Sequence, residues 1–371
     1  MLGTLRKVWL GINERRERRK LPADLITWRN PGLATDLSGK LDERIWGELR
    51  SFFKSRGYTY WPVEYAYLQT DPGGDLVCNG FGYASLQRGW KSSDGSSSYQ
   101  KLKEFDYANP LCWAARAADG RDVVIRVLAV RSHGKSHVEI LKLLSRRHYS
   151  VIDRNHAIPL FELIKYEDVT FGIFPKIGFS VFVAYGPMSW AKNSVGDIVD
   201  MFMQCVEALE FIHYVGVAHK DAFRDNFLVQ FQPESLAMKR IAVTRPRVYL
   251  TDFETAVYFP PNVPWEKRTC VGLPSSSSFP REKYGRVKPP ELLSDAPYDP
   301  FKLDVWQLAI SFVDLTTTIS SIDDVMEAMR CSDASLRLSS SEALAKLIEA
   351  VASIPPQSLL IPPEVAVPVP E

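Results

Sequence analysis

The sequence predicts an α+β protein of two lobes, in which a small β-rich lobe precedes a larger helical lobe. Three observations predict this arrangement. The chain has 371 residues, enough for two lobes of roughly 100–200 residues each. Up to about residue 177, short apolar stretches alternate with turn residues, as in strands. Beyond about residue 178, apolar residues recur three and four positions apart, as in helices.

Composition and charge exclude several classes of protein. Hydrophobic residues make up 46% and charged residues 24% of the chain, which is typical of a folded globular protein rather than a disordered or fibrous one. Lys and Arg number 45 against 44 Asp and Glu, so the net charge of +1 gives no reason to expect a nucleic-acid or membrane-surface partner. No apolar run reaches the roughly 18 residues needed to span a bilayer. We therefore expect an intracellular protein, cytoplasmic or nuclear.

The first hundred residues are expected to form an N-terminal extension, residues 1–100, with one helix over 42–53. The small lobe should follow over about 101–177. Its expected strands cover 111–116, 123–128, 158–164 and 170–174, and its expected helix covers 138–144. The five cysteines are scattered, which argues against disulfides and zinc. His133 and His137 are four apart, but Gly134 between them favours a solvated loop over a metal site.

The large lobe should occupy about 178–354, so that the two lobes together form one domain over 101–354. Apolar periodicity predicts a long helix from residue 195 that ends near Gly216, a common helix terminator. A helix over 304–315 is apolar nearly all round and should be buried, and another is expected over 341–351. The proline-rich tail, 355–371, cannot be helical and should form an extended strap.

Two short segments of the large lobe carry chemistry. The first contains His219, Lys220 and Asp221, with Asn226 five residues after Asp221. The second, 252–254, reads Asp-Phe-Glu and follows an apolar strand-like stretch. Together they resemble the catalytic loop (H-R-D-x-x-x-x-N) and the metal-binding D-F-G of eukaryotic protein kinases. Pro-Pro-Glu at 289–291 stands where those kinases close their activation segment with A-P-E.

The resemblance implies roles for individual residues. Asp221 would orient the acceptor hydroxyl, Asn226 and Asp252 would bind Mg²⁺, and ATP would be the phosphate donor. Asp304 would hold the backbone of the catalytic loop, and Arg337 would pair with Glu291. The hinge between the lobes would run through 175–177 and bind the purine. Its expected nucleotide-binding residues are Phe174, Pro175 and Ile177.

Several short segments resemble a group of kinase-like proteins of basidiomycete fungi more specifically. These segments are 155–160, 217–219 and 298–302. The whole resemblance covers about 51–351 and is most specific over 217–308.

The sequence also departs from the kinase pattern. The third-strand Lys, which would contact the α- and β-phosphates, is Arg126, with Glu139 on the next helix as its expected partner. The stretch 105–110, just before Trp113, contains no glycine that would let backbone N–H groups approach phosphates. Glu254 replaces the glycine of D-F-G. Phe223 stands where many kinases place a γ-phosphate-contacting Lys, for which Arg224 is a possible substitute.

Three functions follow from these features. The first is a Ser/Thr-type protein kinase that uses ATP and Mg²⁺ at an altered nucleotide site. The second is a pseudokinase, a nucleotide-binding or scaffolding module with little or no transfer. The third is a phosphotransferase that acts on a small molecule, against which the long segment from Asp252 to Glu291 counts. The substrate protein is not predictable from the sequence.

Overall fold

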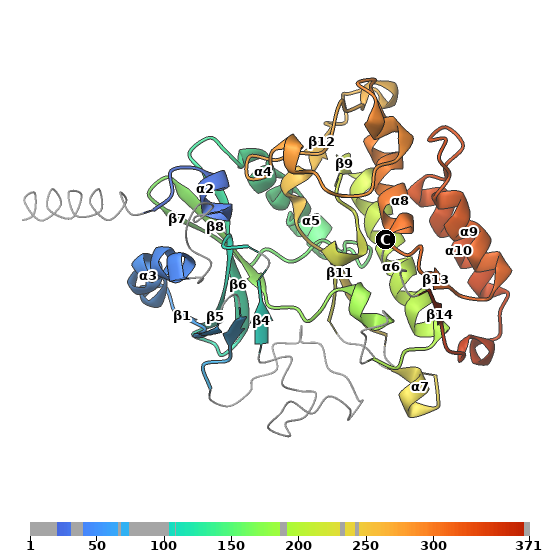
Figure 1. Ribbon diagram of the computed structural model, residues 1–371, viewed down its shortest axis with the longest axis horizontal. Coiled ribbons are helices and arrows are strands. Elements are labelled where there is room, and N and C mark those ends of the chain that lie inside the picture. The colour runs from blue at the N-terminus through green and yellow to red at the C-terminus, as the bar shows by residue number, and fades with distance from the viewer. Residues whose placement is uncertain are drawn as a thin grey trace, which may run out of the picture.

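The computed structural model describes residues 21–30, 40–65, 68–73, 104–107, 109–185, 191–230, 234–241 and 245–366. Figure 1 shows a small lobe built around a β-sheet beside a larger, mainly helical lobe. This is the bilobal kinase-like α+β fold that the sequence predicts. No helix in the described ranges combines the length and apolar character that crossing a membrane requires.

The small lobe contains an antiparallel five-stranded sheet in the order β1-β5-β6-β8-β7. Its strands are β1 (Tyr58–Tyr60), β5 (Cys112–Ala117), β6 (Asp122–Val130), β7 (Glu162–Tyr166) and β8 (Val169–Pro175). Gly120, with φ of 84°, allows the tight turn between β5 and β6. The expected strands at 111–116, 123–128 and 170–174 are confirmed, whereas the strand expected from 158 begins only at Glu162.

Two helices from the first hundred residues cover one face of this sheet (Figure 1). They are α2 (Leu25–Arg29) and α3 (Lys40–Ser55). An aromatic cluster joins them to the strands, for example through Trp46 and Trp113, whose stacked rings lie 5.6 Å apart. Trp28 and Trp46 are completely buried. The expected boundary at residue 101 is therefore wrong: residues 21–30 and 40–65 include parts of the small lobe itself, and β1 supplies a strand of its sheet.

The opposite face of the sheet meets α4 (Lys135–Leu144) and, beyond it, the large lobe (Figure 1). The helix begins three residues earlier than expected, after Gly134, whose φ of 84° suits glycine. His137 therefore lies within a helix and is buried, which corrects the solvated loop expected for it. The short helix α5 (Arg147–Ser150) follows.

A second, three-stranded sheet lies between β1 and β5 in the chain. It contains β2 (Val63–Tyr65), β3 (Leu68–Thr70) and β4 (Glu104–Asp106). The chain thus leaves the main sheet after β1 and returns at β5 through a separate structure. The strands β2, β3 and β4 thus lie between β1 and β5, where protein kinases carry a short glycine-rich turn.

The described part of the large lobe contains five α-helices, and all of them except the shortest contribute side chains to one apolar core. They are α6 (Val195–Tyr214), α7 (Ser235–Met238), α8 (Pro300–Ile310), α9 (Ser320–Met329) and α10 (Ser340–Ala352). A capping box of Ser194 and Asp197 starts α6, because each side chain accepts a hydrogen bond from the other residue's backbone N–H. The expected helices at 195–216 and 341–351 are confirmed. The buried helix expected over 304–315 is also present, but it runs from 300 to 310.

Short strand pairs shape the remaining segments of this lobe. They are β9 (Val217–Ala218) with β12 (Val257–Tyr258), β10 (Phe227–Val229) with β11 (Val248–Leu250), and β13 (Leu315–Thr316) with β14 (Glu364–Val365). The last pair holds part of the proline-rich tail against the lobe, and Val195 N–H donates to Ile361 O at 2.9 Å. The tail is not extended throughout, however, because Pro356–Leu359 form a short 3-10 helix, a departure from the strap without helix that the prolines predicted.

Candidate active site

Asp304 on α8 fixes the backbone of the loop that follows β9. Its carboxylate is fully buried and accepts hydrogen bonds from the backbone N–H groups of His219 at 2.7 Å and Lys220 at 2.6 Å. Gln307, one turn further along α8, accepts from the N–H of Ala222 at 2.9 Å. The structure thus confirms that Asp304 holds this loop. Lys220 adopts a left-handed φ of 63°, a conformation that these contacts stabilise.

This loop brings Asp221 and Asn226 together. The Asn226 amide nitrogen donates to the Asp221 carboxylate at 2.8 Å and to its carbonyl at 2.7 Å. Arg286, from the segment before 289–291, donates to both Asp221 oxygens at 3.3 and 3.4 Å and to Asp225 at 2.7 Å. Burial raises the pKa of Asp221, and the Arg286 charge opposes that rise. Asp221 is thus a partly buried carboxylate at the mouth of the site, paired with a cation that sequence reasoning missed.

Strand pairing places Asp252 next to these residues. Phe227 of β10 pairs with Leu250 of β11, and Thr251 N–H donates to Asn226 O at 2.9 Å. Asp252 follows directly, with a left-handed φ of 64°. Burial opposes ionisation of Asp252, but the Arg126 and Arg29 charges outweigh it and lower the pKa of Asp252. The site therefore holds an ionised Asp252 beside the pair of Asp221 and Asn226.

Arg126 reaches the site from the central strand β6. Side chains alternate between the faces of a strand, so Val123, Ile125 and Val127 enter the aromatic core while Arg126 points the other way. Its guanidinium lies 2.5 Å from the Asp252 carboxylate and 3.3 Å from that of Glu254. Burial alone would lower the pKa of Arg126, but these acidic neighbours raise it.

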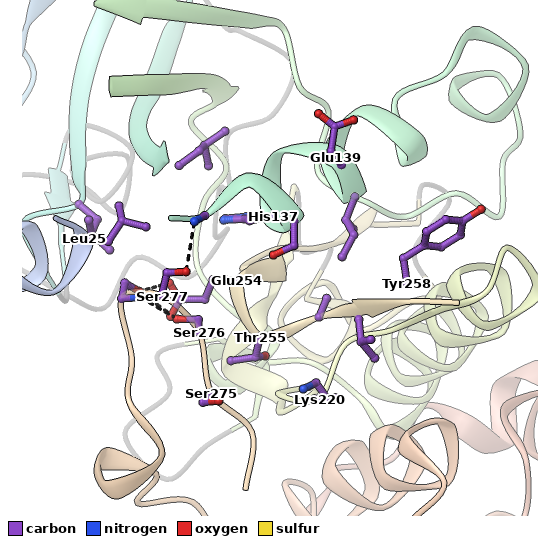
Figure 2. A pocket seen from close by; sticks show the side chains of 18 of the residues that line it. Leu25, His137, Glu139, Lys220, Glu254, Thr255, Tyr258, Ser275, Ser276 and Ser277 are labelled. Atoms are coloured by element: carbon purple, nitrogen blue, oxygen red, sulfur yellow. Dashed lines mark hydrogen bonds between the residues drawn. The ribbon is translucent and has the colours of Figure 1, made fainter. Parts of the chain in front are cut away.

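The expected ion pair between Arg126 and Glu139 is not formed among the described residues. Glu139 instead pairs with Lys142 at 2.9 Å, and both side chains are more than half exposed. Figure 2 shows the Glu139 carboxylate directed away from Glu254. The reason is the phase of α4, which starts at Lys135 and turns His137, rather than Glu139, towards the cavity that Arg126 lines.

His137 is therefore the residue of α4 that belongs to the site. Burial, together with the nearby Arg126 charge, lowers the pKa of His137 to about 3. The imidazole is therefore neutral at physiological pH and carries no charge that could pair with Arg126. The carboxylates that hold Arg126 come from the 252–254 segment instead.

Glu254 joins three parts of the chain. Its carboxylate accepts from the Ser278 hydroxyl at 2.7 Å, from Arg126 and, through a short contact, from Arg29 of α2. Burial raises the pKa of Glu254, and the neighbouring Asp252 raises it further. Arg29, Arg126, Asp252 and Glu254 form what we call the four-charge cluster, with two positive and two negative members. Sequence reasoning gave no sign of Arg29, since it lies 225 residues from Glu254.

A cavity of about 360 Å³ extends from Arg126 and Asp252 to the connection between the lobes. Phe174, Pro175 and Ile177 line it as expected, and Leu228 and Ile158 add apolar surface. Phe174 is buried in the wall of this cavity, and its contact with a purine stays a prediction. Lys176 in the same segment is buried 4.9 Å from the centre of the Trp61 ring. Burial lowers the pKa of Lys176 to about 8.

A second and larger cavity, of about 720 Å³, lies between α4 and the segment after 254 (Figure 2). Ser275–Ser278, Lys220 and Glu254 border it. Ser277 accepts from the backbone N–H of Gly134 at 3.2 Å, which joins this serine run to the start of α4. The cavity shares Glu254 with the four-charge cluster and His137 with the 360 Å³ cavity.

The segment from 252 to 291 is anchored at its far end by Glu291. Arg337 donates to the Glu291 carboxylate at 2.6 and 3.3 Å, and the Arg337 side chain is fully buried. The expected pair is thus confirmed. Arg224, by contrast, is bound by Asp314 at 2.6 and 3.1 Å, which directs it away from Asp221. The cation next to Phe223 is instead Arg286, whose guanidinium carbon lies 4.8 Å from the centre of that ring.

Comparison with known proteins bears on this arrangement. No protein-family model matches the chain. It is 29% identical over 178 residues to the serine/threonine-protein kinase ppk8 of Schizosaccharomyces pombe, a match that covers 47% of this chain and 26% of that protein. It is 25% identical over 182 residues to a probable casein kinase II subunit alpha homolog of Encephalitozoon cuniculi, covering 48% of this chain and 43% of that one.

Over about half its length the chain is similar to protein kinases. It spans less than half the length of either of these curated relatives. Both are named as kinases, in agreement with the bilobal fold and with the grouping of Asp221, Asn226 and Asp252. The resemblance to kinase-like proteins of basidiomycetes remains a prediction.

Proposed function

We propose that this chain is a protein-kinase-like phosphotransferase that moves the γ-phosphate of ATP to a serine or threonine hydroxyl of a protein. The observation that carries the proposal is the grouping of Asp221, Asn226 and Asp252, two carboxylates and an amide, on a loop held by the buried Asp304. Since ATP is an intracellular metabolite, the proposal includes an intracellular location.

The residues of the 360 Å³ cavity suit ATP. Its apolar surface near Phe174, Ile177 and Leu228 offers a place for a purine. At its other end, the Nε–H of Arg126 is buried and has no hydrogen-bond partner in the described part of the chain. An unpaired buried donor of positive charge is complementary to a phosphate oxygen. Arg126 would donate this Nε–H to a phosphate oxygen. Its other contact, from the guanidinium to Asp252, would be replaced in part by contacts with the phosphates.

Mg²⁺ suits the same site because it prefers oxygen ligands, which Asp252 and Asn226 provide. When bound with ATP, Mg²⁺ would neutralise charge on the phosphates during transfer. Asp221 would orient the acceptor hydroxyl and accept its proton. Arg286 contacts both oxygens of Asp221 in this structure, so we expect the acceptor to share or displace that contact. Glu139 has no role in this proposal.

A protein substrate is proposed because of the segment between Asp252 and Glu291. This segment is anchored at both ends, by the four-charge cluster and by Arg337, and it carries Arg286 to Asp221. Such a surface beside the acceptor site can position a polypeptide. A small-molecule substrate would not need an extended surface beside the acceptor site.

One specific observation favours the pseudokinase alternative. The 2.5 Å contact between Arg126 and Asp252 occupies an oxygen that Mg²⁺ would use, and Glu254 adds a second carboxylate nearby. A module that keeps this contact would hold nucleotide weakly and transfer little. The two functions make different predictions for one assay.

The test is transfer of labelled phosphate from ATP with Mg²⁺ to a panel of proteins, comparing the wild type with Asp221→Asn. Asp225→Asn is the matched control, since Asp225 also binds Arg286 but is half exposed. We expect transfer that is lost in Asp221→Asn and retained in Asp225→Asn. Nucleotide binding by calorimetry without any transfer would replace the proposal by the pseudokinase.

A further inference from the structure

The N-terminal helix α2 reaches the nucleotide site through Arg29. The Arg29 guanidinium contacts one oxygen of Glu254, and the other oxygen lies 3.3 Å from Arg126. Arg126 in turn lies 2.5 Å from Asp252. Positive and negative groups therefore alternate along the four-charge cluster, and each side chain is at least three-quarters buried.

Helix α2 is well suited to hold Arg29 in place. It has only five residues, but Trp28 is fully buried against Trp46 and Phe171, with ring centres 5.9 and 6.3 Å apart. Asp24 caps its start by accepting from the Thr27 N–H at 2.8 Å. The Arg29 guanidinium also lies 5.5 Å from the centre of the Phe279 ring, in the segment after 254. Arg29 is thus fixed between the small lobe and that segment.

The charge balance of the cluster gives Arg29 a function. Glu254 is a carboxylate in the place that kinases give to glycine, so it adds negative charge close to where phosphates would bind. An unpaired buried carboxylate next to Arg126 would compete with phosphate for the guanidinium. Arg29 neutralises Glu254, which leaves Arg126 free to exchange Asp252 for phosphate. The two departures from the kinase pattern, Arg126 and Glu254, are thereby compatible in one site.

We propose that Arg29 is a positioning residue of the nucleotide site, which holds Glu254 so that Arg126 can bind the phosphates of ATP. This inference rests on the proposed function, because it concerns the same cavity. It extends the site to a helix that begins 227 positions before Asp252 in the chain, counted from Leu25. It does not require Arg29 to touch the nucleotide.

The test is a double-mutant cycle in the full chain, with Arg29→Ala, Glu254→Gln and the combination. The affinity for ATP with Mg²⁺ is measured by calorimetry, and thermal unfolding is measured without nucleotide. We expect Arg29→Ala to weaken ATP binding by about tenfold or more, a usual size for coupling between contacting charges. Glu254→Gln should restore most of the loss, because it removes the competing charge. Arg29→Lys should retain affinity close to wild type.

Ile26→Ala is the matched control, since Ile26 is on the same helix but exposed, and it should bind ATP like the wild type. If Arg29→Ala lowers the melting temperature but binds ATP with unchanged affinity, Arg29 is only a structural contact and the inference is wrong. The same conclusion follows if Glu254→Gln fails to restore binding in a folded double variant. Wild-type ATP binding that depends on Arg29, without phosphate transfer, would overturn the phosphotransferase and keep the inference. No ATP binding by the wild type would overturn both.

Discussion

Arg337 and Glu291 form an ion pair in which the arginine side chain is completely buried. Two further backbone carbonyls, of Cys331 and Lys302, accept from the same guanidinium at 2.8 and 2.9 Å. The pair therefore connects the end of the 252–291 segment to the helical lobe through a fully buried arginine and a mostly buried glutamate.

Replacing Arg337 by Ala should destabilise the protein strongly. The change leaves Glu291 without its cation and several carbonyls without a donor, and removing one partner of a buried pair typically costs about 3–5 kcal/mol. Urea unfolding should show this loss in the free energy of unfolding. Lys142→Ala, which breaks the exposed pair with Glu139, should cost less than about 1 kcal/mol. Similar small effects for both variants would contradict the anchoring role of Arg337.

Trp28→Ala should be as damaging as a central core substitution, although the residue lies near the start of the chain. Trp28 is fully buried in the aromatic cluster, and truncating a buried aromatic residue to Ala costs about 3–5 kcal/mol. Thermal unfolding measures the effect, with the half-exposed Trp265→Ala as control. A protein that tolerates Trp28→Ala without loss would show that α2 is an appendage of the small lobe.

Lys176 should make stability depend on pH in the alkaline range. Burial lowers the pKa of Lys176 to about 8, below the roughly 10.4 of an unfolded lysine. Between these values the unfolded chain binds the proton more tightly, so stability rises with pH, by at most about 1.4 kcal/mol per pH unit. Below pH 8 both states are protonated and the dependence disappears.

Lys176→Met should remove this contribution. We expect the difference in unfolding free energy between wild type and Lys176→Met to shift in favour of the wild type from pH 8 to pH 10. The exposed Lys165→Met should show no such shift. A difference that stays constant over this range would mean that Lys176 is solvated in solution.

The effect on phosphate transfer of replacing Arg126 should depend on whether the new side chain is positively charged. Arg126→Ala removes the cation proposed to bind the phosphates, and a lost electrostatic contact of this kind typically lowers kcat by about 100-fold or more. Arg126→Lys keeps a compact positive charge and should retain or raise transfer. Steady-state kinetics with varied ATP measures both. Transfer unchanged in Arg126→Ala, or abolished in Arg126→Lys while the wild type is active, would disprove the proposed role.

The parts of the site that are contiguous in sequence were predictable. Asp221 and Asn226 lie five positions apart, as the kinase resemblance requires, and the same resemblance assigned Asp304 to the buried helix that holds their loop. The pair of Arg337 and Glu291 followed from the kinase resemblance. The residues in both cases stand in short motifs that the resemblance identifies, and the fold brings these motifs together.

The predictions that the structure contradicts, and the residues that were missed, depend on the phase of a helix or on pairing between distant segments. A helix expected from residue 138 leaves His137 outside it and favours Glu139 as the partner of Arg126, but α4 begins at Lys135 and turns His137 inward. The strand β1 has three residues, and its partner β5 begins more than fifty positions later, so no hairpin signal marks it. Arg29 and Arg286 carry no motif, and only folding brings them to Glu254 and Asp221.

Because Arg29 and Glu254 lie far apart in the chain, they are synthesised at different times. Arg29 leaves the ribosome 225 residues before its partner, an interval of roughly 10–45 s at the usual rates of translation. The small-lobe sheet can close earlier, because its last strand, β8, ends at Pro175. During the remaining interval Arg29 and Arg126 lack the carboxylates of Asp252 and Glu254, with which they pair only after the 252–254 segment emerges and docks.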